Sequence, residues 1–235
     1  PTSSRKWAGL EMYHQTFPQI PPFETGFQIV ARLAHLVRPK EHLTVSQWAE
    51  KHMAHYDADA LPFLAEIMDA CSDPVTCEVG DMGPAQGGKS TVGEAFMGWS
   101  IEHDPAPFMV VQPDKTLMEN FVKLRINPLV TNTPALRSQL APVSNADNMY
   151  VKLFRGMYLV SAWPVENQFR QRPICRGWLD DYDGMEPDIE GKGDAIGLLD
   201  GRMTTFKGRD TKLVSSSPAL GEALGARSFI ERADV

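Results

Sequence analysis

The sequence of 235 residues predicts an α/β fold in which a mainly parallel sheet is flanked by helices and preceded by a helical N-terminal region. Three observations lead to this prediction. Short apolar or β-branched stretches recur along the chain, at residues 75–79, 108–111, 174–179 and 211–214. Helical patterns, with apolar residues three and four positions apart, separate these stretches. A glycine-rich stretch stands between the first of them and the helix that follows it.

The glycine-rich stretch fits the phosphate-binding pattern G-x-x-x-x-G-K-[ST] and reads Gly83-Pro84-Ala85-Gln86-Gly87-Gly88-Lys89-Ser90. In this pattern the backbone N–H groups of the loop and the positive end of the next helix face the phosphates of a nucleotide. Lys89 would reach the β- and γ-phosphates of ATP, the Ser90 hydroxyl would ligate Mg²⁺, and Thr91 lies beside them. A glycine-rich turn without a ligand is the alternative, but packing gives no reason for a Lys-Ser pair. The sequence therefore predicts a P-loop NTPase of the RecA-like class, with ATP and Mg²⁺ as ligands.

Composition argues against several other classes of protein. The net charge of −7 is opposite to that of a polybasic module that binds nucleic acid by bulk charge. No run approaches the roughly 20 apolar residues that span a bilayer, and no signal peptide is recognisable, so no membrane association is expected. The three cysteines are widely spaced and the six histidines show no metal-binding spacing. Reduced, mostly buried thiols and no structural zinc are therefore expected.

The N-terminal part divides into two expected regions. Residues 1–40 are predicted to form an arm and one helix, and residues 41–235 an ATPase domain. The arm covers residues 1–26, which include Pro18, Pro21 and Pro22, and the helix runs over residues 27–38 until Pro39 ends it.

Two more helices are expected before the phosphate loop. Thr44 and Gln47 form a capping box at the start of one, and Pro62 suits the first turn of the other. Tyr56 or Phe63 could stack on the adenine ring of a nucleotide. Each could equally be a core aromatic residue, and the sequence leaves that open.

Beyond the phosphate loop, a helix is expected from Asp114 to Ile126, with Asp114 as its N-cap. A β-hairpin is expected over residues 149–162, with Arg155 and Gly156 in its turn. The helix residues expected to face inward are Leu117, Phe121 and Leu124.

An apolar strand that ends in Asp180-Asp181-Tyr182-Asp183 supplies the second part that a P-loop enzyme requires. Asp180 is assigned to the hydration shell of Mg²⁺, and Asp181 to the attacking water, which it would orient and deprotonate. The alternative is an acidic turn on a solvated loop, but the phosphate loop upstream favours the functional interpretation. Another strand is expected between the strands that carry the two motifs.

A cluster of hydroxyls, Ser215-Ser216-Ser217, ends the last predicted strand. Near the γ-phosphate it could sense hydrolysis and pass the change to the rest of the fold. An ordinary Ser-Pro loop explains the cluster equally well.

Several short motifs occur together in one order along roughly residues 40–235. They occupy residues 43–49, 61–70, 72–74, 78–79, 85–90, 180–183, 193–194, 202–206 and 216–218. Together they resemble the GpA type of phage terminase large subunit, and specifically its N-terminal ATPase domain. The resemblance implies a DNA-packaging motor that hydrolyses ATP in the host cytoplasm and moves double-stranded DNA into proheads. It implies the portal and the small terminase subunit as partners, and a homo-oligomeric ring on the portal that could be a monomer in isolation.

The resemblance also assigns roles to individual residues. It places the phosphate loop and the Mg²⁺-site acid at the residues named above, and it places Asp181 where the family usually has Glu. The shorter carboxylate reaches about one methylene less far, which could weaken water activation. Ser216 and Ser217 match the motif that couples hydrolysis to movement, where Ser-Thr is usual. No second acidic constellation is present, so the family's C-terminal nuclease domain is expected to be absent from this chain.

The arginine that stabilises charge on the γ-phosphate has three candidates in the sequence. Arg202 matches an arginine that follows the acidic motif in the family, and Arg172 and Arg227 are rivals. Possible DNA contacts are Lys123, Arg125 and Lys207, which could also be plain solvated charges.

Two other functions stay open from the sequence. A helicase-like DNA-dependent ATPase would share the acidic box, but it would need a second RecA-like domain, for which the chain lacks length. A nucleotide-binding assembly module with little turnover is compatible with Asp at position 181. A non-functional remnant conflicts with the intact Lys89 and Asp180.

Overall fold

The computed structural model describes residues 25–34, 41–170, 172–217, 226–231 and 233. Contacts divide the chain into two units, residues 1–40 and 41–235, and each is described by itself. In the first unit the described element is helix α1 (Gly26–Ala34), which begins one residue before the helix predicted over residues 27–38. Residues 1–24 of the predicted arm lie outside the described residues.

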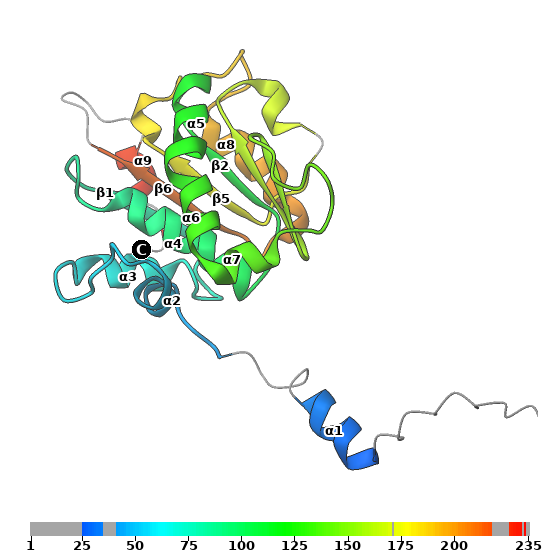
Figure 1. The fold of residues 1–235 in the computed structure, drawn as a ribbon. Helices are drawn as coiled ribbons and strands as arrows, with labels where there is room; N and C mark the ends of the chain where they lie inside the picture. Colours follow the sequence, from blue (N-terminus) through cyan, green and yellow to red (C-terminus); the bar gives the residue numbers. More distant parts are fainter. Residues whose placement is uncertain (1–24, 35–40, 171, 218–225, 232, 234–235) are drawn as a thin grey trace, which may run out of the picture. The chain divides into compact units, whose positions relative to one another are not determined.

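The second unit is built on a six-stranded sheet with the strand order β1-β6-β5-β2-β4-β3 (Figure 1). Neighbouring strands are parallel except β3 and β4, which form the predicted hairpin around Arg155 and Gly156. The mainly parallel α/β fold is therefore confirmed. The strands are β1 (Glu78–Met82), β2 (Phe108–Val111), β3 (Val151–Phe154), β4 (Met157–Ala162), β5 (Arg176–Asp180) and β6 (Thr211–Ser216).

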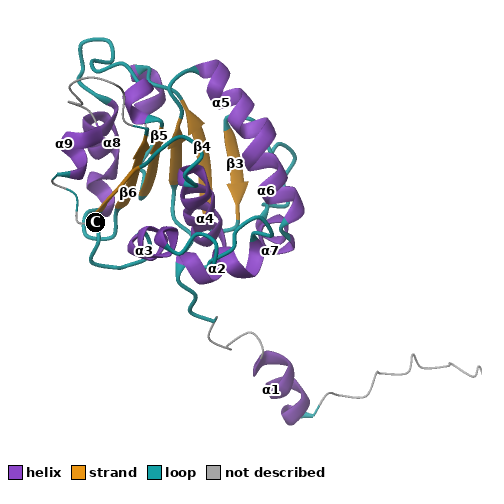
Figure 2. Ribbon diagram, turned by 90° about the vertical axis from the view of Figure 1, so that its left-hand side faces the viewer, coloured by secondary structure: helices purple, strands orange, loops and turns teal. Residues whose placement is uncertain are grey.

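Helices cover both faces of this sheet (Figure 2). One face carries α4 (Lys89–Glu102), α5 (Lys115–Phe121), the π-helical turn η1 (Val122–Ile126), α6 (Asn127–Asn132) and α7 (Pro134–Gln139), and α2 (Val45–His52) and α3 (Phe63–Ala70) pack on α4. The other face carries α8 (Ala195–Met203) and α9 (Ala226–Ile230). Short 3₁₀ turns occur at η2 (Glu166–Phe169), η3 (Tyr182–Gly184) and η4 (Thr204–Phe206).

Each face has its own apolar core because side chains alternate along the strands. In β5, Gly177 faces Leu199 of α8, whereas Trp178 faces α4. The Trp178 ring packs so closely on Gly93 that a Cβ there would lie 2.1 Å from the ring. Glycine in the middle of α4 thus lets the helix approach β5 closely and fixes the helix that carries the phosphate loop.

The first turn of α2 matches its prediction closely. The Thr44 side chain accepts a hydrogen bond from the Gln47 N–H, and the Gln47 side chain accepts one from the Thr44 N–H, which completes the capping box. This motif is local in sequence, so the sequence alone suffices to find it.

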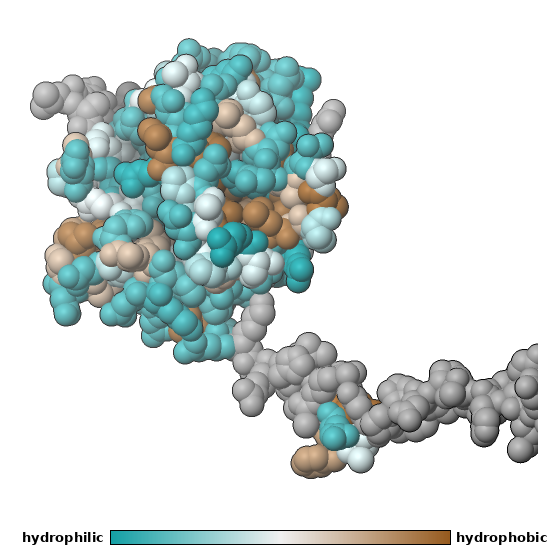
Figure 3. Space-filling view, in the orientation of Figure 1, coloured by the Kyte–Doolittle hydropathy of each residue, from teal (hydrophilic) through white to brown (hydrophobic). Residues whose placement is uncertain are grey.

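Other details differ from the predictions. The first strand spans Glu78–Met82 instead of the expected residues 75–79, so it includes Asp81. The inward positions expected for Leu117 and Leu124 are wrong, since these side chains are 45% and 73% exposed. The buried residues on that segment are Met118, Val122 and Ile126, spaced by four across a π-helical turn, which shifts the inward face by one residue. Figure 3 views this side of the molecule and shows apolar residues at the surface among hydrophilic ones.

No helix in the described part of the chain combines the length and the apolar character needed to cross a membrane.

Candidate nucleotide site

The candidate site lies where the parallel strands β1, β6 and β5 end side by side. We call this side of the sheet, formed by the carboxyl ends of the parallel strands, its carboxyl edge. β6 separates β1 from β5, as predicted for an ATPase with a strand between its two motifs. The strand register places Asp81 opposite Ser215, and Ser215 opposite Asp180. Residues opposite one another in a parallel sheet share a face. Trp178 faces α4 and lies two residues before Asp180, so Asp180, Ser215 and Asp81 share the face of the sheet that α4 covers.

The phosphate loop connects β1 to α4 through a tight turn. The Gly87 N–H donates to the Pro84 carbonyl at 3.1 Å, and Gly88 has a left-handed φ of 91°. At Gly88 a side chain would also collide with Leu64, since a Cβ would lie 2.5 Å from its Cδ1 atom. The N–H groups of Thr91 and Val92 donate to the Gly88 carbonyl, so the helix begins directly after the loop. A helix N-terminus adjoining a glycine loop is an anion-binding arrangement.

Lys89 lies over this loop. Its ammonium donates hydrogen bonds to the carbonyl oxygens of Gly83 at 2.9 Å and Pro84 at 2.7 Å. A cavity of about 330 Å³ opens beside the ammonium, lined by residues 86–91 and Arg125. The predicted ATP-binding residues Gln86, Gly87, Gly88, Lys89, Ser90 and Thr91 thus line one cavity.

Asp180 ends β5 with its carboxylate held from both sides. Gln112, directly after β2, donates its amide N–H at 2.9 Å, and the Ser215 hydroxyl donates at 2.9 Å. Ser215 in turn accepts from the Trp178 indole N–H at 2.9 Å. Burial raises the pKa of Asp180, the Gln112 and Ser215 hydrogen bonds lower it, Asp181 raises it and Lys89 lowers it, with a net rise. The result is a half-buried carboxyl group that is held in place and whose pKa responds to the charge of Lys89.

Ser90 and Asp180 fit an Mg²⁺–nucleotide site. The described residues contain no group of three or more His, Cys, Asp or Glu side chains that could hold a metal ion. Mg²⁺ typically takes only one or two protein ligands and completes its shell with waters and substrate phosphates. A loop hydroxyl and one oriented carboxylate meet that requirement.

Asp181 follows Asp180 and lies on the solvent side of the edge. Its side chain is exposed, and its backbone adopts the left-handed conformation with φ 52° and ψ 53° at the start of η3. Asp tolerates this conformation better than most residues, and such positions concentrate at functional sites.

Ser216 connects the phosphate loop to the segment after the acidic pair. Its carbonyl accepts from the Gly83 N–H at 3.3 Å, and its hydroxyl accepts from the Asp183 N–H at 3.1 Å. Ser217 is half-buried and follows the end of β6. Sequence reasoning selected Ser216 and Ser217, yet the serine that contacts Asp180 is Ser215, because alternation along β6 places position 215 on the α4 face.

Sequence reasoning also missed Gln112 and Asp81. Asp81 is 5% exposed, and its Oδ2 has no hydrogen-bond partner among the described residues. Burial raises the pKa of Asp81 to about 6, Lys89 opposes the rise and Asp180 adds to it. Both residues follow apolar strand residues at a strand's carboxyl end, and that position was the available signal.

The structure does not bring Arg202 or Arg172 to this site. The Arg202 carbonyl accepts from the Ile174 N–H at 3.0 Å, just before β5 begins, so Arg202 lies at the opposite, amino edge of the sheet. Arg172 precedes the same strand and is exposed, and the Arg227 side chain is not among those described. Arg125 is the arginine that lines the phosphate cavity.

The two candidates for adenine stacking differ in exposure. Tyr56 is 6% exposed and belongs to the core on the α4 face, whereas Phe63 is 57% exposed. Neither lines the cavity beside Lys89.

The strand order, with β6 between β1 and β5, and the glycine loop that leads into α4 define the class of mixed α/β folds with a mostly parallel six-stranded sheet. Residues 51–235 match the model of one family within it, described as phage terminase large subunit gpA, ATPase domain, and the chain belongs to that family.

Curated relatives agree with this assignment. The terminase large subunit of Enterobacteria phage P21 is 26% identical over 68% of this chain, and that of Escherichia phage lambda is 28% identical over 74%. The matched parts are 27% and 29% of those proteins, so the chain spans less than a third of their length. The crystal structure of the HK97 bacteriophage large terminase has a similar fold, with a TM-score of 0.54 at 11% identity, covering 74% of this chain and 38% of the other.

Proposed function

We propose that this chain is the ATPase motor part of a phage large terminase, and that it hydrolyses ATP to translocate double-stranded DNA into proheads. The observation that carries the proposal is the meeting of the phosphate loop and the hydrogen-bonded Asp180 at one sheet edge, within a terminase ATPase family. The host cytoplasm is the corresponding location, and portal and small terminase subunit are the corresponding partners.

The proposed chemistry is an in-line attack of water on the γ-phosphate of ATP. Backbone N–H groups of the loop would face the phosphates, other than Pro84, which has none, and Gly83 and Gly87, whose N–H groups donate to carbonyls. Lys89 would exchange the carbonyls of Gly83 and Pro84 for phosphate oxygens. Ser90 and Asp180 would hold Mg²⁺, which would supply positive charge to the phosphates. Gln112 and Ser215 fix the Asp180 carboxylate, so the site supplies mostly positioning and charge stabilisation.

Asp181 is proposed to orient and deprotonate the attacking water. An exposed carboxylate directly after the Mg²⁺-site acid suits that role. Ser216 is proposed to couple hydrolysis to movement because it bonds both the loop backbone and the backbone after Asp181, and Ser217 continues that segment.

Arg202 is proposed to contact the γ-phosphate bound by a neighbouring copy in a ring. Within its own chain it lies at the other edge of the sheet. Of the three cations selected from the sequence, Arg125 lines the phosphate cavity, and the exposed Lys123 and Lys207 are proposed DNA contacts, which would make DNA binding modest and salt-sensitive.

The test is Mg²⁺-dependent ATP hydrolysis with and without duplex DNA, in wild type and Lys89→Ala. We expect Lys89→Ala to lower turnover at least about 100-fold, because the loss of a charge-assisted phosphate contact acts directly on the transition state. Lys51→Ala is the control, since this surface lysine of α2 pairs only with the exposed Glu41 among the contacts described.

Stimulation by duplex DNA would support the motor. Binding of ATP without turnover, even at raised protein concentration or with portal added, would instead indicate a nucleotide-binding assembly module. Equal turnover in wild type and Lys89→Ala would overturn the proposed site.

A further inference from the structure

A second cavity of about 330 Å³ lies next to the phosphate cavity, between α4, the η1–α6 segment and the end of α2. Its lining includes His55, Glu94, Leu124, Arg125 and Leu129. Arg125 is the one described residue that lines both cavities. A side chain that borders both spaces can serve either of them without a change in the fold.

Glu94 is a buried carboxylate at the floor of this second cavity. Its side chain is 3% exposed and lies on α4 one turn after Ser90. A carboxylate taken out of water requires partners, and its partners are Arg125 and His55. Burial raises the pKa of Glu94 to about 7 even though Arg125 lowers it, and Asp180 adds to the rise.

The contacts of Glu94 are loose. The Arg125 Nη1 atom lies 3.3 Å from Oε1, and the His55 Nε2 atom lies 3.6 Å from Oε2. Oε1 has no hydrogen-bond partner among the described residues. A charge-assisted hydrogen bond between Arg and carboxylate is normally about 2.7–2.9 Å long and often bidentate. This pair therefore holds Arg125 nearby without using the full strength of its guanidinium group.

Arg125 is placed to reach a phosphate. It lies in the π-helical turn η1, and such turns occur frequently at functional sites. Its side chain is 50% exposed, and it borders the cavity formed by the phosphate loop. Guanidinium groups match phosphate oxygens in geometry and charge.

We propose that Arg125 is a second cationic ligand of the nucleotide phosphates, which Glu94 holds beside the loop and releases when nucleotide binds. The inference rests on the proposed function, since it requires a nucleotide at the loop. Glu94 acts through Arg125 and is a positioning residue.

The exchange has a consequence for protons. When Arg125 moves to phosphate, Glu94 loses the positive charge that lowers its pKa. The groups that face it are then His55 and His52 from the end of α2, and Asp180 from β5, whose negative charge favours the protonated form. Nucleotide binding should therefore take up a fraction of a proton near neutral pH, and Glu94 is the acceptor.

The experiment is calorimetric titration with Mg²⁺-ADP and with a non-hydrolysable Mg²⁺-ATP analogue, in buffers of different ionisation enthalpy. We expect Arg125→Ala to weaken binding at least about tenfold and to abolish proton uptake. Arg137→Ala, which removes an exposed cation of α7 that lines neither cavity, should change binding less than about twofold.

Glu94→Gln distinguishes the proposed role of Glu94, which holds Arg125 until nucleotide binds, from an ordinary structural ion pair. It removes the competitor for Arg125, so nucleotide should bind as tightly as in wild type or more tightly, with no proton uptake. The double variant Glu94→Gln/Arg125→Ala should bind as weakly as Arg125→Ala alone. Thermal unfolding of each variant, followed by circular dichroism, shows whether it is folded.

Failure of the inference is distinct from failure of the proposed function. Loss of binding in Lys89→Ala but not in Arg125→Ala would overturn the inference alone. Equal weakening by Glu94→Gln and Arg125→Ala would also overturn it, because a structural pair predicts that result. No nucleotide binding by wild type would overturn both.

Discussion

The sheet has an amino edge, formed by the amino ends of its parallel strands, and a carboxyl edge, formed by their carboxyl ends. The two edges carry charged side chains of opposite sign, and these side chains have different kinds of partner. At the amino edge the buried cations Arg176 and Lys212 each contact carboxylates. At the carboxyl edge the half-buried carboxyl of Asp180 accepts from neutral donors, and one oxygen of the buried Asp81 has no hydrogen-bond partner among the described residues.

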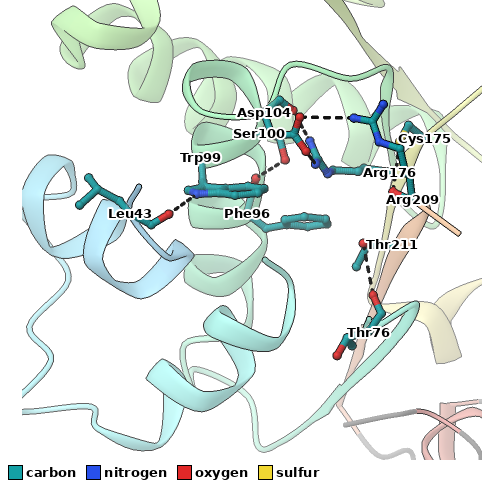
Figure 4. A network of polar contacts seen from close by, with 10 residues as sticks. All are labelled: Leu43, Thr76, Phe96, Trp99, Ser100, Asp104, Cys175, Arg176, Arg209 and Thr211. Carbon is teal, nitrogen blue, oxygen red and sulfur yellow. Dashed lines mark hydrogen bonds and ion pairs between the residues drawn. The ribbon is translucent and has the colours of Figure 1, made fainter. Parts of the chain in front are cut away.

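The amino edge is neutralised within the chain (Figure 4). Arg176, at the start of β5, donates to the carboxylate and the backbone carbonyl of Asp104 and lies over the Trp99 ring, 5.0 Å from its centroid. Trp99 donates its indole N–H to the Leu43 carbonyl at 2.7 Å. Arg209 adds a longer contact to Asp104 at 3.4 Å. These contacts tie β5, the end of α4 and the chain before α2 together.

At the carboxyl edge, no cation among the described residues forms an ion pair with Asp81 or Asp180. Burial raises the pKa values of both Asp81 and Asp180, and Lys89 is the cation whose charge opposes the rise in each. Carboxyls whose pKa is perturbed in this way are typical of functional sites. Charge at the amino edge is paired within the chain, and we infer that charge at the carboxyl edge costs stability and is kept for a ligand.

The largest effect that would test this comparison is on turnover. We expect Asp180→Asn to lower Mg²⁺-dependent ATP hydrolysis about 1,000-fold or more, because it removes the charge that holds the metal. Its free energy of unfolding should change by less than about 1 kcal/mol, because Asn still accepts from Ser215 or Gln112. A steady-state assay and a urea melt on the same preparation measure both. A large loss of stability would place Asp180 with the structural charges.

The matching substitution at the amino edge is Arg176→Met. Leaving a buried charge network without its cation should lower the free energy of unfolding by about 3 kcal/mol, as measured by urea denaturation. Turnover per folded molecule should stay within about threefold of wild type. The exposed Arg137→Ala is the control and should be neutral. If Arg176→Met removed activity without loss of stability, the division between the edges would be wrong.

A smaller effect of opposite sign is expected at Asp81. Its pKa in the folded state, about 6, lies above its ordinary value of 3.8, so the folded protein binds the proton more tightly than the unfolded chain. Stability from this group is present below about pH 4 and is lost as the pH rises through 6. Asp81→Asn lacks that loss and should be more stable than wild type by about 1–2 kcal/mol at pH 7.

Urea melts of wild type and Asp81→Asn at pH 4.5, 5.5 and 7 test this sign. The difference in the free energy of unfolding should grow with pH and level off above about pH 7. Parallel curves for the two proteins would show that Asp81 ionises without cost.

These edges also show what could be predicted from sequence. The loop that ends in Lys89-Ser90, the capping box at Thr44 and the strand that ends in Asp180 depend on neighbours within a few residues, and each was predicted. Ser215, Gln112 and Asp81 gain their importance from strand register, which joins residues far apart in the chain. No local pattern shows which serine of a triplet faces a carboxylate on the next strand.

Helix geometry caused a different failure. Leu117 and Leu124 fit a regular apolar stripe, but the π-helical turn at η1 adds a residue to the turn and directs other side chains inward. The same turn carries Arg125, which sequence reasoning treated as a possible DNA contact and which the structure places beside the phosphate loop.

The smallest predicted effect concerns Asp181, where two influences oppose one another. In Asp181→Glu the longer side chain should bring the carboxylate closer to the attacking water. The left-handed backbone at this position suits Asp better than Glu, at a cost of about 1 kcal/mol. We therefore expect turnover to rise about two- to fivefold while the melting temperature falls by a few degrees.

Asp181→Asn keeps the size and the backbone preference but removes the base, so it should lose at least about tenfold in turnover. If Asp181→Asn kept full activity, another group would activate the water, and the exposed carboxylate would belong with the solvated charges of the surface.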